Sequence, residues 1–156
     1  MRLTDILKPE CIKVPLVATD KQSAVYEMIE LLAAQELITD VQMVKQAVWQ
    51  RESTRTTGIG HGLAIPHGKC DCCASLCMAI GRPAQPIDFN SIDGRPVSVI
   101  ILLVSPTDQT GPHIQALATV SRMMTDDNFR AAIRQAASAE QVFKLIEDHE
   151  KVHAAK

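Results

Sequence analysis

The stretch Val97–Val104, VSVIILLV, is the longest apolar run in the chain and indicates the fold class. Its β-branched and aliphatic side chains are typical of a strand that is buried on both faces of a sheet. A turn signal, Asp93-Gly94, comes shortly before it. The run is far shorter than the roughly 20 residues that a membrane-spanning helix needs. It therefore predicts the central strand of a buried sheet.

Helices and shorter strands alternate along the rest of the chain. We expect strands over 11–17, 63–65 and 75–81, the first at a sheet edge because it contains Pro15. Asp20 and Asp40 are candidate N-caps of two helices, the second of which ends near 51–52. Three more helices are expected over 114–124, 127–137 and 139–148, before a frayed C-terminal tail over 151–156. This interleaving predicts an α/β layered fold with a mixed sheet.

Composition narrows the function classes. The chain has 156 residues, of which 46% are apolar, so we expect one domain with a sizeable core. The net charge of −2 and the lack of a basic stripe argue against nucleic acid as a partner. The N-terminus mixes charges early and has no secretory apolar core. We therefore expect a cytoplasmic protein that does not insert into a membrane.

The segment Gly60–Gly68, GHGLAIPHG, contains the first candidate for chemistry, His67. Most histidines are surface or structural groups, but Pro66 should end the strand over 63–65 and leave His67 projecting at its end. Gly68 would then leave room for a reactant to approach. A neutral imidazole is a nucleophile near pH 7 and can hold a phosphoryl group as a phosphoramidate.

Phosphoryl transfer needs positive charge and hydrogen-bond donors around the transferred group. Arg51 lies at a predicted helix end and could present its planar guanidinium to phosphate oxygens. His113 follows Gly111-Pro112 at the head of another predicted helix and could donate a hydrogen bond. The glycine-rich loop could add further donors as phosphate-loop support, through Thr57, Gly58, Gly60 and His61.

The segments 51–68, 86–97 and 102–117 resemble those of enzyme IIA domains of the fructose/mannitol class in the bacterial phosphotransferase system. The long A-I-P-H-G motif with its upstream R-E is the most specific part of this resemblance. The resemblance implies a type-2 EIIA domain over 1–150, with a mixed, mostly parallel sheet flanked by helices on both faces. It implies that His67 is phosphorylated on Nε2, that Arg51 steadies the phosphoryl group, and that His113 is the second active-site histidine. No cofactor is implied.

The resemblance also implies partners. The donor would be the histidine phosphocarrier protein, itself charged from phosphoenolpyruvate by enzyme I. We expect a free-standing IIA domain, and such a domain is most similar to the nitrogen-regulatory branch, which signals by binding regulatory target proteins. The alternative is a sugar-specific component that passes phosphate to a cysteine of a IIB domain. A pure docking module, with the glycine loop and nearby apolar residues as its contact face, is compatible with either.

Two departures from the family pattern leave alternatives open. His61 stands where the family commonly has Asn, either as a loop substitution or as an added proton donor near the phosphate. Four cysteines crowd into 70–77, and Cys70, Cys73 and Cys77 are candidate metal ligands. A cysteine-based metal or redox-sensing protein is therefore the alternative from another class. The odd cysteine count itself does not suggest a disulfide framework.

Overall fold

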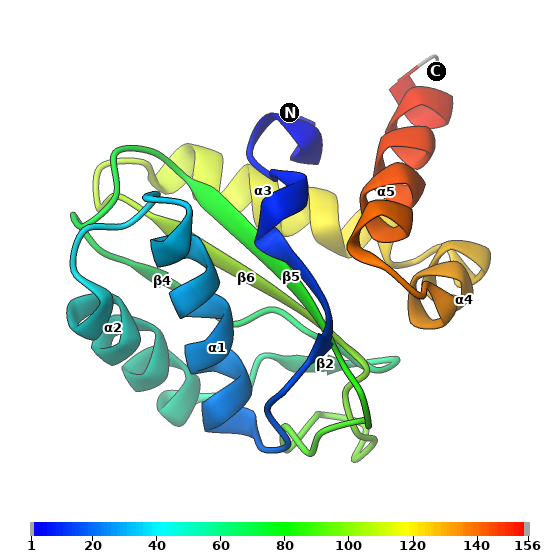
Figure 1. Ribbon diagram of the computed structural model, residues 1–156, viewed down its shortest axis with the longest axis horizontal. Coiled ribbons are helices and arrows are strands. Elements are labelled where there is room, and N and C mark those ends of the chain that lie inside the picture. Colours follow the sequence, from blue (N-terminus) through cyan, green and yellow to red (C-terminus); the bar gives the residue numbers. More distant parts are fainter. Residues whose placement is uncertain (1, 155–156) are drawn as a thin grey trace.

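The computed structural model describes residues 2–154, which fold around a six-stranded mixed sheet (Figure 1). The strand order is β1-β5-β6-β3-β2, and β4 also pairs with β6. The strands are β1 (Ile12–Leu16), β2 (Gly58–Gly60), β3 (Leu63–Ala64), β4 (His67–Lys69), β5 (Cys77–Pro83) and β6 (Val99–Ser105). The helices are α1 (Lys21–Ala34), α2 (Val41–Thr54), α3 (Thr110–Met123), α4 (Asp127–Gln135) and α5 (Ala139–Ala154), after two 3₁₀ turns at Leu3–Asp5 and Pro9–Cys11.

The predicted central strand is confirmed as β6, in which every residue is buried. It pairs antiparallel with β5 and parallel with both β3 and β4. The remaining pairs are the parallel pair β1–β5 and the antiparallel pair β2–β3. The sheet is therefore mixed and mostly parallel, and β1, which contains Pro15, lies at its edge as expected.

The strand that leads to the candidate histidine ends at Ala64, before Pro66, and a second short strand begins directly after the proline. Leu63 and Ala64 pair with Val99 and Ile100 of β6, and pairing resumes at His67, opposite Leu103. Pro66 lacks an N–H, yet its carbonyl accepts a hydrogen bond from the Leu103 amide, so the two short strands share one partner. The expected strand end is present, since β3 stops at Ala64 before Pro66, but His67 does not project from a free strand end, because it is the first residue of β4.

Helices cover both faces of the sheet. Figure 1 shows α1 and α2 in front of the sheet and α3 behind it. The two predicted N-caps are confirmed, because Asp20 accepts a hydrogen bond from the Ser23 amide and Asp40 accepts one from the Met43 amide. At the C-terminus, α5 continues to Ala154, so 151–154 of the predicted frayed tail are helical. The last two residues of that tail, 155 and 156, lie outside the described residues.

Gly68 has a different purpose from the one its sequence context suggested. A Cβ added there would lie 3.0 Å from Val48 Cγ2 and 3.2 Å from both the Cα and the amide nitrogen of Val48. The glycine therefore lets α2 pack against β4 instead of leaving room for a reactant beside His67. This close packing brings the last turn of α2, with Arg51, to the start of β4.

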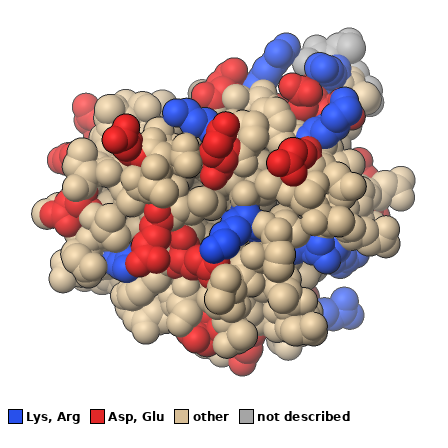
Figure 2. Space-filling view, viewed as in Figure 1, with Lys and Arg blue, Asp and Glu red and all other residues tan. Residues whose placement is uncertain are grey.

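Charged side chains of both signs are interspersed over the face seen in Figure 2, in keeping with the small net charge. Within 2–154, none of the helices combines the length and the apolar character that a bilayer span requires.

Candidate functional site

The imidazole of His67 is held in one tautomer by the backbone. Its Nδ1 lies 2.7 Å from the carbonyl oxygen of Ile65. A carbonyl can only accept a hydrogen bond, so Nδ1 carries the proton and the Nε2 lone pair is free. The ring is half-buried at the start of β4. The geometry thus leaves Nε2 as the ring nitrogen without a proton.

The electrostatic surroundings keep this ring neutral. Burial lowers the pKa of His67 below its ordinary value of 6.5. The positive charges of Arg51 and Lys69 lower the pKa further, while the Ile65 carbonyl and the Glu52 carboxylate oppose the shift. At neutral pH the imidazole is therefore unprotonated on Nε2, as a nucleophile must be.

His113, from the first turns of α3, lies beside His67. The two ring centroids are 5.4 Å apart, with an angle of 62° between the ring planes. Nδ1 of His113 is 2.7 Å from the Ser105 hydroxyl oxygen, and both side chains are buried. Burial lowers the pKa of His113 to about 4, and the positive charge of His67 when it is protonated and that of Lys69 add to this shift. A serine hydroxyl can donate to the Nδ1 of a neutral ring, which leaves Nε2–H as a hydrogen-bond donor.

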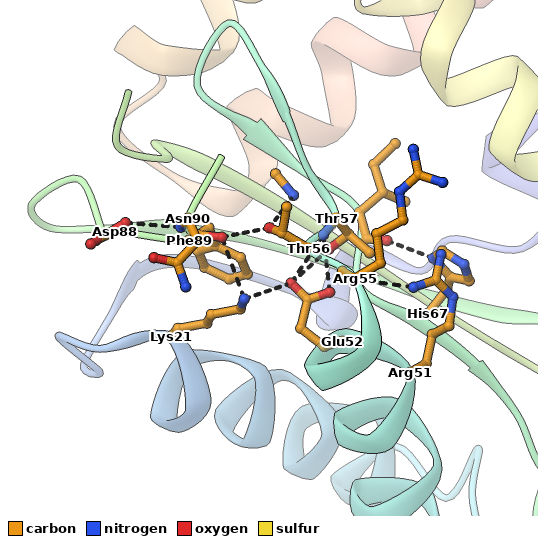
Figure 3. Close-up of polar contacts among 12 residues, drawn as sticks. Lys21, Arg51, Glu52, Arg55, Thr56, Thr57, His67, Asp88, Phe89 and Asn90 are labelled. Carbon is orange, nitrogen blue, oxygen red and sulfur yellow. Dashed lines mark hydrogen bonds and ion pairs between the residues drawn. The ribbon is translucent and has the colours of Figure 1, made fainter. Parts of the chain in front are cut away.

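Arg51 shares a surface depression with His67. The depression, of about 260 Å³, is lined on its apolar side by Ile59, Ile92 and Leu117. Arg51 lies in the last turn of α2, and its Nη1 donates to the Arg55 carbonyl at 3.2 Å. Figure 3 shows the Arg51 side chain directed toward His67. The structure thus brings together the three residues Arg51, His67 and His113.

Three backbone amides of the glycine loop are already hydrogen-bonded within the protein, so they are not free to bind a phosphate. The amides of Thr57, Gly58 and His61 donate to Glu52, to the Thr56 hydroxyl and to Asp93, respectively. A Cβ on Gly58 would lie 2.3 Å from the Ser91 hydroxyl oxygen, so that glycine allows a close approach of the 88–93 loop. These three amides are satisfied within the protein.

His61 lies outside the depression that contains His67. It is exposed, has a left-handed φ of 57°, and lines a neighbouring depression with Gly60, Asp127 and Arg130. Gly60, with a φ of 102°, forms the same turn. This placement favours the loop substitution over an added proton donor at the phosphate.

The cysteine cluster does not form a metal centre. Cys70 is bonded to Cys72 in a disulfide, a pairing that the sequence did not suggest. The thiols of Cys73 and Cys77 are buried, and burial raises the pKa of both, that of Cys77 to about 12. Across 2–154, the structure holds no group of three or more His, Cys, Asp or Glu side chains arranged to bind a metal ion. The three predicted ligands Cys70, Cys73 and Cys77 therefore do not converge.

Sequence reasoning missed three polar residues that surround the histidines: Glu52, Lys69 and Ser105. Lys69 lies two residues after His67 on the same strand, and this spacing places both on one face. Ser105 ends the apolar run of β6, where a polar residue marks the strand's end. The sequence drew attention to Glu52 only as the glutamate of the R-E pair in the family motif.

The fold and this site define a class of protein: a single α/β domain that presents a neutral histidine beside a second histidine and an arginine. Residues 5–149 match the family described as "Phosphoenolpyruvate-dependent sugar phosphotransferase system, EIIA 2". The chain belongs to this family, and the resemblance seen in the sequence is confirmed.

Two curated relatives show the breadth of the family. The chain is 35% identical to the nitrogen regulatory protein of Escherichia coli (strain K12) over 153 residues, which cover 96% of the chain and 92% of that protein. It is 29% identical over 151 residues to the fructose-specific EIIABC component of Bacillus subtilis (strain 168), covering 97% of the chain but only 24% of that longer protein.

The nitrogen regulatory protein IIA-Ntr of Neisseria meningitidis has a similar crystal structure. The TM-score is 0.84 at 29% sequence identity, with 91% of this chain and 97% of that chain covered. The chain is therefore a IIA domain of the phosphotransferase system in both sequence and fold.

Proposed function

We propose that His67 accepts a phosphoryl group on Nε2 and holds it as a phosphohistidine. The observation that carries this proposal is the 2.7 Å hydrogen bond from Nδ1 to the Ile65 carbonyl, which leaves Nε2 unprotonated. The lowered pKa of His67 supports it, because the ring is neutral at physiological pH.

The transfer itself exchanges one phosphorus–nitrogen bond for another. Nε2 attacks in line, the Nε2–P bond forms, and the bond between phosphorus and the donor's histidine nitrogen breaks. The His67 ring keeps its Nδ1 proton and gains positive charge, which the Ile65 carbonyl dipole stabilises. Arg51 and the Nε2–H of His113 stabilise the negative charge on the phosphoryl oxygens.

The donor in this proposal is the histidine phosphocarrier protein of the phosphotransferase system. Exposed apolar side chains surround the site and provide a docking surface for it: Ile92 is 70% exposed, Ile114 58% and Ile59 43%. A carrier that covers them would exclude water from the phosphoryl group during transfer.

The similarities favour a regulatory role for the phosphorylated domain. The relative called nitrogen regulatory protein is matched over 92% of its length, and it is more similar to the chain than the fructose-specific protein, at 35% against 29% identity. In this role the phosphorylation state of His67 decides which regulatory target protein the domain binds. The second candidate, supported by the fructose-specific relative, is a sugar-uptake component that passes the phosphoryl group to a IIB cysteine.

A phosphorylation assay tests the central step. The protein is incubated with phosphoenolpyruvate, enzyme I and the phosphocarrier protein, and intact mass is measured before and after acid treatment. We expect one acid-labile phosphoryl group, absent from His67→Ala and present in the control His153→Ala, whose histidine is exposed on α5. No mass gain with active partners, or an undiminished gain in His67→Ala, would overturn the proposal.

The two outputs are separated by a second measurement. Phosphorylated protein is mixed with a fructose-type IIB domain, and the fate of the phosphoryl group is followed. Retention on His67, together with different partner sets for the unphosphorylated protein and a His67→Asp mimic, favours regulation. Rapid transfer to the IIB cysteine favours the sugar-uptake role.

A further inference from the structure

Glu52 is a buried carboxylate in the last turn of α2, and its side chain leaves the helix in a different direction from that of Arg51 (Figure 3). The residue is only 2% exposed. Its oxygens accept hydrogen bonds from the Thr57 amide at 3.1 and 3.2 Å and from the Thr57 hydroxyl at 3.1 Å. The Lys21 ammonium lies 3.2 Å from Oε1. A buried carboxylate destabilises the folded state unless it is paired and hydrogen-bonded in this way. The four contacts therefore hold the Glu52 side chain in one position.

Lys21, the first residue of α1, is itself held in place. Its Nζ donates to the Phe89 carbonyl at 3.3 Å and lies 5.3 Å from the centre of the Phe89 ring. Its side chain is only 16% exposed. The Lys21–Glu52 pair therefore ties together α1, α2 and the 88–93 loop, and Thr57 is bound at their junction.

A path of hydrogen bonds leads from this pair to the candidate nucleophile. The Thr57 carbonyl accepts from the Ile65 amide at 3.1 Å. The Ile65 carbonyl in turn accepts from Nδ1 of His67 at 2.7 Å. Thr57 donates through its N–H and accepts through its C=O, and Ile65 does the same. A shift of Thr57 is therefore transmitted to the Ile65 carbonyl, which selects the tautomer of His67.

We propose that the Lys21–Glu52 ion pair positions the His67 imidazole for phosphoryl transfer, by holding Thr57 and through it the Ile65 carbonyl that binds Nδ1–H. This inference rests on the proposed function of His67. Lys21 and Glu52 are positioning residues, because their bonds reach the ring only through Thr57 and Ile65. A pair that served stability alone would have no effect on which nitrogen of His67 is protonated.

The tautomer of His67 is the first readout, and it needs no partner protein. In ¹⁵N-labelled protein at pH 8, long-range ¹H–¹⁵N spectra report which ring nitrogen carries the proton, and His67→Ala assigns the signals. We expect the Nδ1–H form in the wild type. In Glu52→Gln the Nε2–H form should gain population, because the amide no longer pairs with Lys21 and Thr57 is held less firmly.

The rate of phosphorylation of His67 is the second readout. Displacing a nucleophile from its in-line position is expected to slow transfer in Glu52→Gln by roughly tenfold to a hundredfold. The matched control is Glu30→Gln, which breaks another ion pair between α1 and α2, Glu30–Lys45 at 2.9 Å, on the exposed side of the helices. Glu30→Gln should keep both the wild-type tautomer and the wild-type rate.

A neutral double variant keeps the inference testable if the single variant does not fold. If Glu52→Gln does not fold, Lys21→Met/Glu52→Gln leaves no buried charge and should be tolerated better. If the inference is correct, this double variant also shows less of the Nδ1–H tautomer of His67 and slower phosphorylation of His67.

Only the joint change supports the inference: an unchanged tautomer or an unchanged rate in a folded variant overturns it. A wild-type protein that holds the Nδ1–H tautomer but takes up no phosphate counts instead against the proposed function.

Discussion

Gly68→Ala should destabilise the domain and impair the site at the same time. Gly68 lies on β4 next to His67, and a Cβ there would meet the backbone and side chain of Val48 in α2. The backbone of Gly68 does not have the positive φ that would itself forbid a side chain. The effect of the substitution therefore reports on the packing of α2 against β4.

The magnitude follows from the contact distances. The added Cβ would lie 3.0 to 3.2 Å from atoms of Val48, whereas carbon atoms pack comfortably at about 3.5–4.0 Å. Two of these atoms belong to the helix backbone, so relief requires α2 to move by roughly half an ångström. Overpacking of this kind costs about 1–3 kcal/mol of unfolding free energy. Because Arg51 is in the following turn of α2, phosphorylation should slow several-fold as well.

Urea denaturation and the phosphorylation assay measure the two effects. The control is Gly111→Ala, because a Cβ at Gly111 meets nothing within 4 Å, and its unfolding free energy should change by no more than about 0.5 kcal/mol. If Gly68→Ala unfolded at the wild-type urea concentration and accepted phosphate at the wild-type rate, the reasoning about α2 would be refuted.

Three further predictions concern separate parts of the molecule. Arg51→Ala should slow phosphorylation of His67 by roughly 10²-fold with an unchanged urea midpoint, because this half-buried side chain supplies charge and little core packing; transfer at the wild-type rate would contradict its role. Burial lowers the pKa of His113 from 6.5 to about 4, so between these pH values the unfolded chain binds a proton that the folded chain excludes. The unfolding free energy should therefore fall as pH drops from 6.5 toward 4, and urea titrations of His113→Gln should show a flatter profile. Glu36 is exposed with a φ of 59° after α1, where the Leu37 amide binds the Leu32 carbonyl. Glu36→Gly should raise the unfolding free energy by about 1 kcal/mol, and a lower urea midpoint would argue against strain at this position.

The features that were predictable from the sequence are those with local signals. The apolar run 97–104 predicted β6, and the aspartates before α1 and α2 predicted their starts, because strand burial and N-capping depend on residues only a few positions apart. The same holds for the edge position of β1, which Pro15 indicated.

The features that were missed depend on contacts between distant segments. Gly68 was interpreted as space for a reactant, yet the neighbour that requires a glycine is Val48, 20 positions earlier in the chain. The Thr57 amide was expected to serve a phosphate, yet Glu52 takes it, since the last turn of α2 folds back over the loop. Such pairings follow from how the helices pack on the sheet, and local patterns carry no signal for them.

The sequence by itself determined the fold class and, through its A-I-P-H-G motif, which histidine to consider as the nucleophile. The periodicity of apolar residues and the spacing of a motif are properties of one segment. They can therefore be recognised without knowing which other segments pack against it. Only the tertiary structure supplied the contacts behind what the resemblance implied, namely the Ile65 carbonyl that binds Nδ1 of His67 and the buried position of His113 beside it, and only the tertiary structure placed Glu52 against Lys21. These facts depend on burial and on hydrogen bonds, which exist only when segments distant in sequence are packed together.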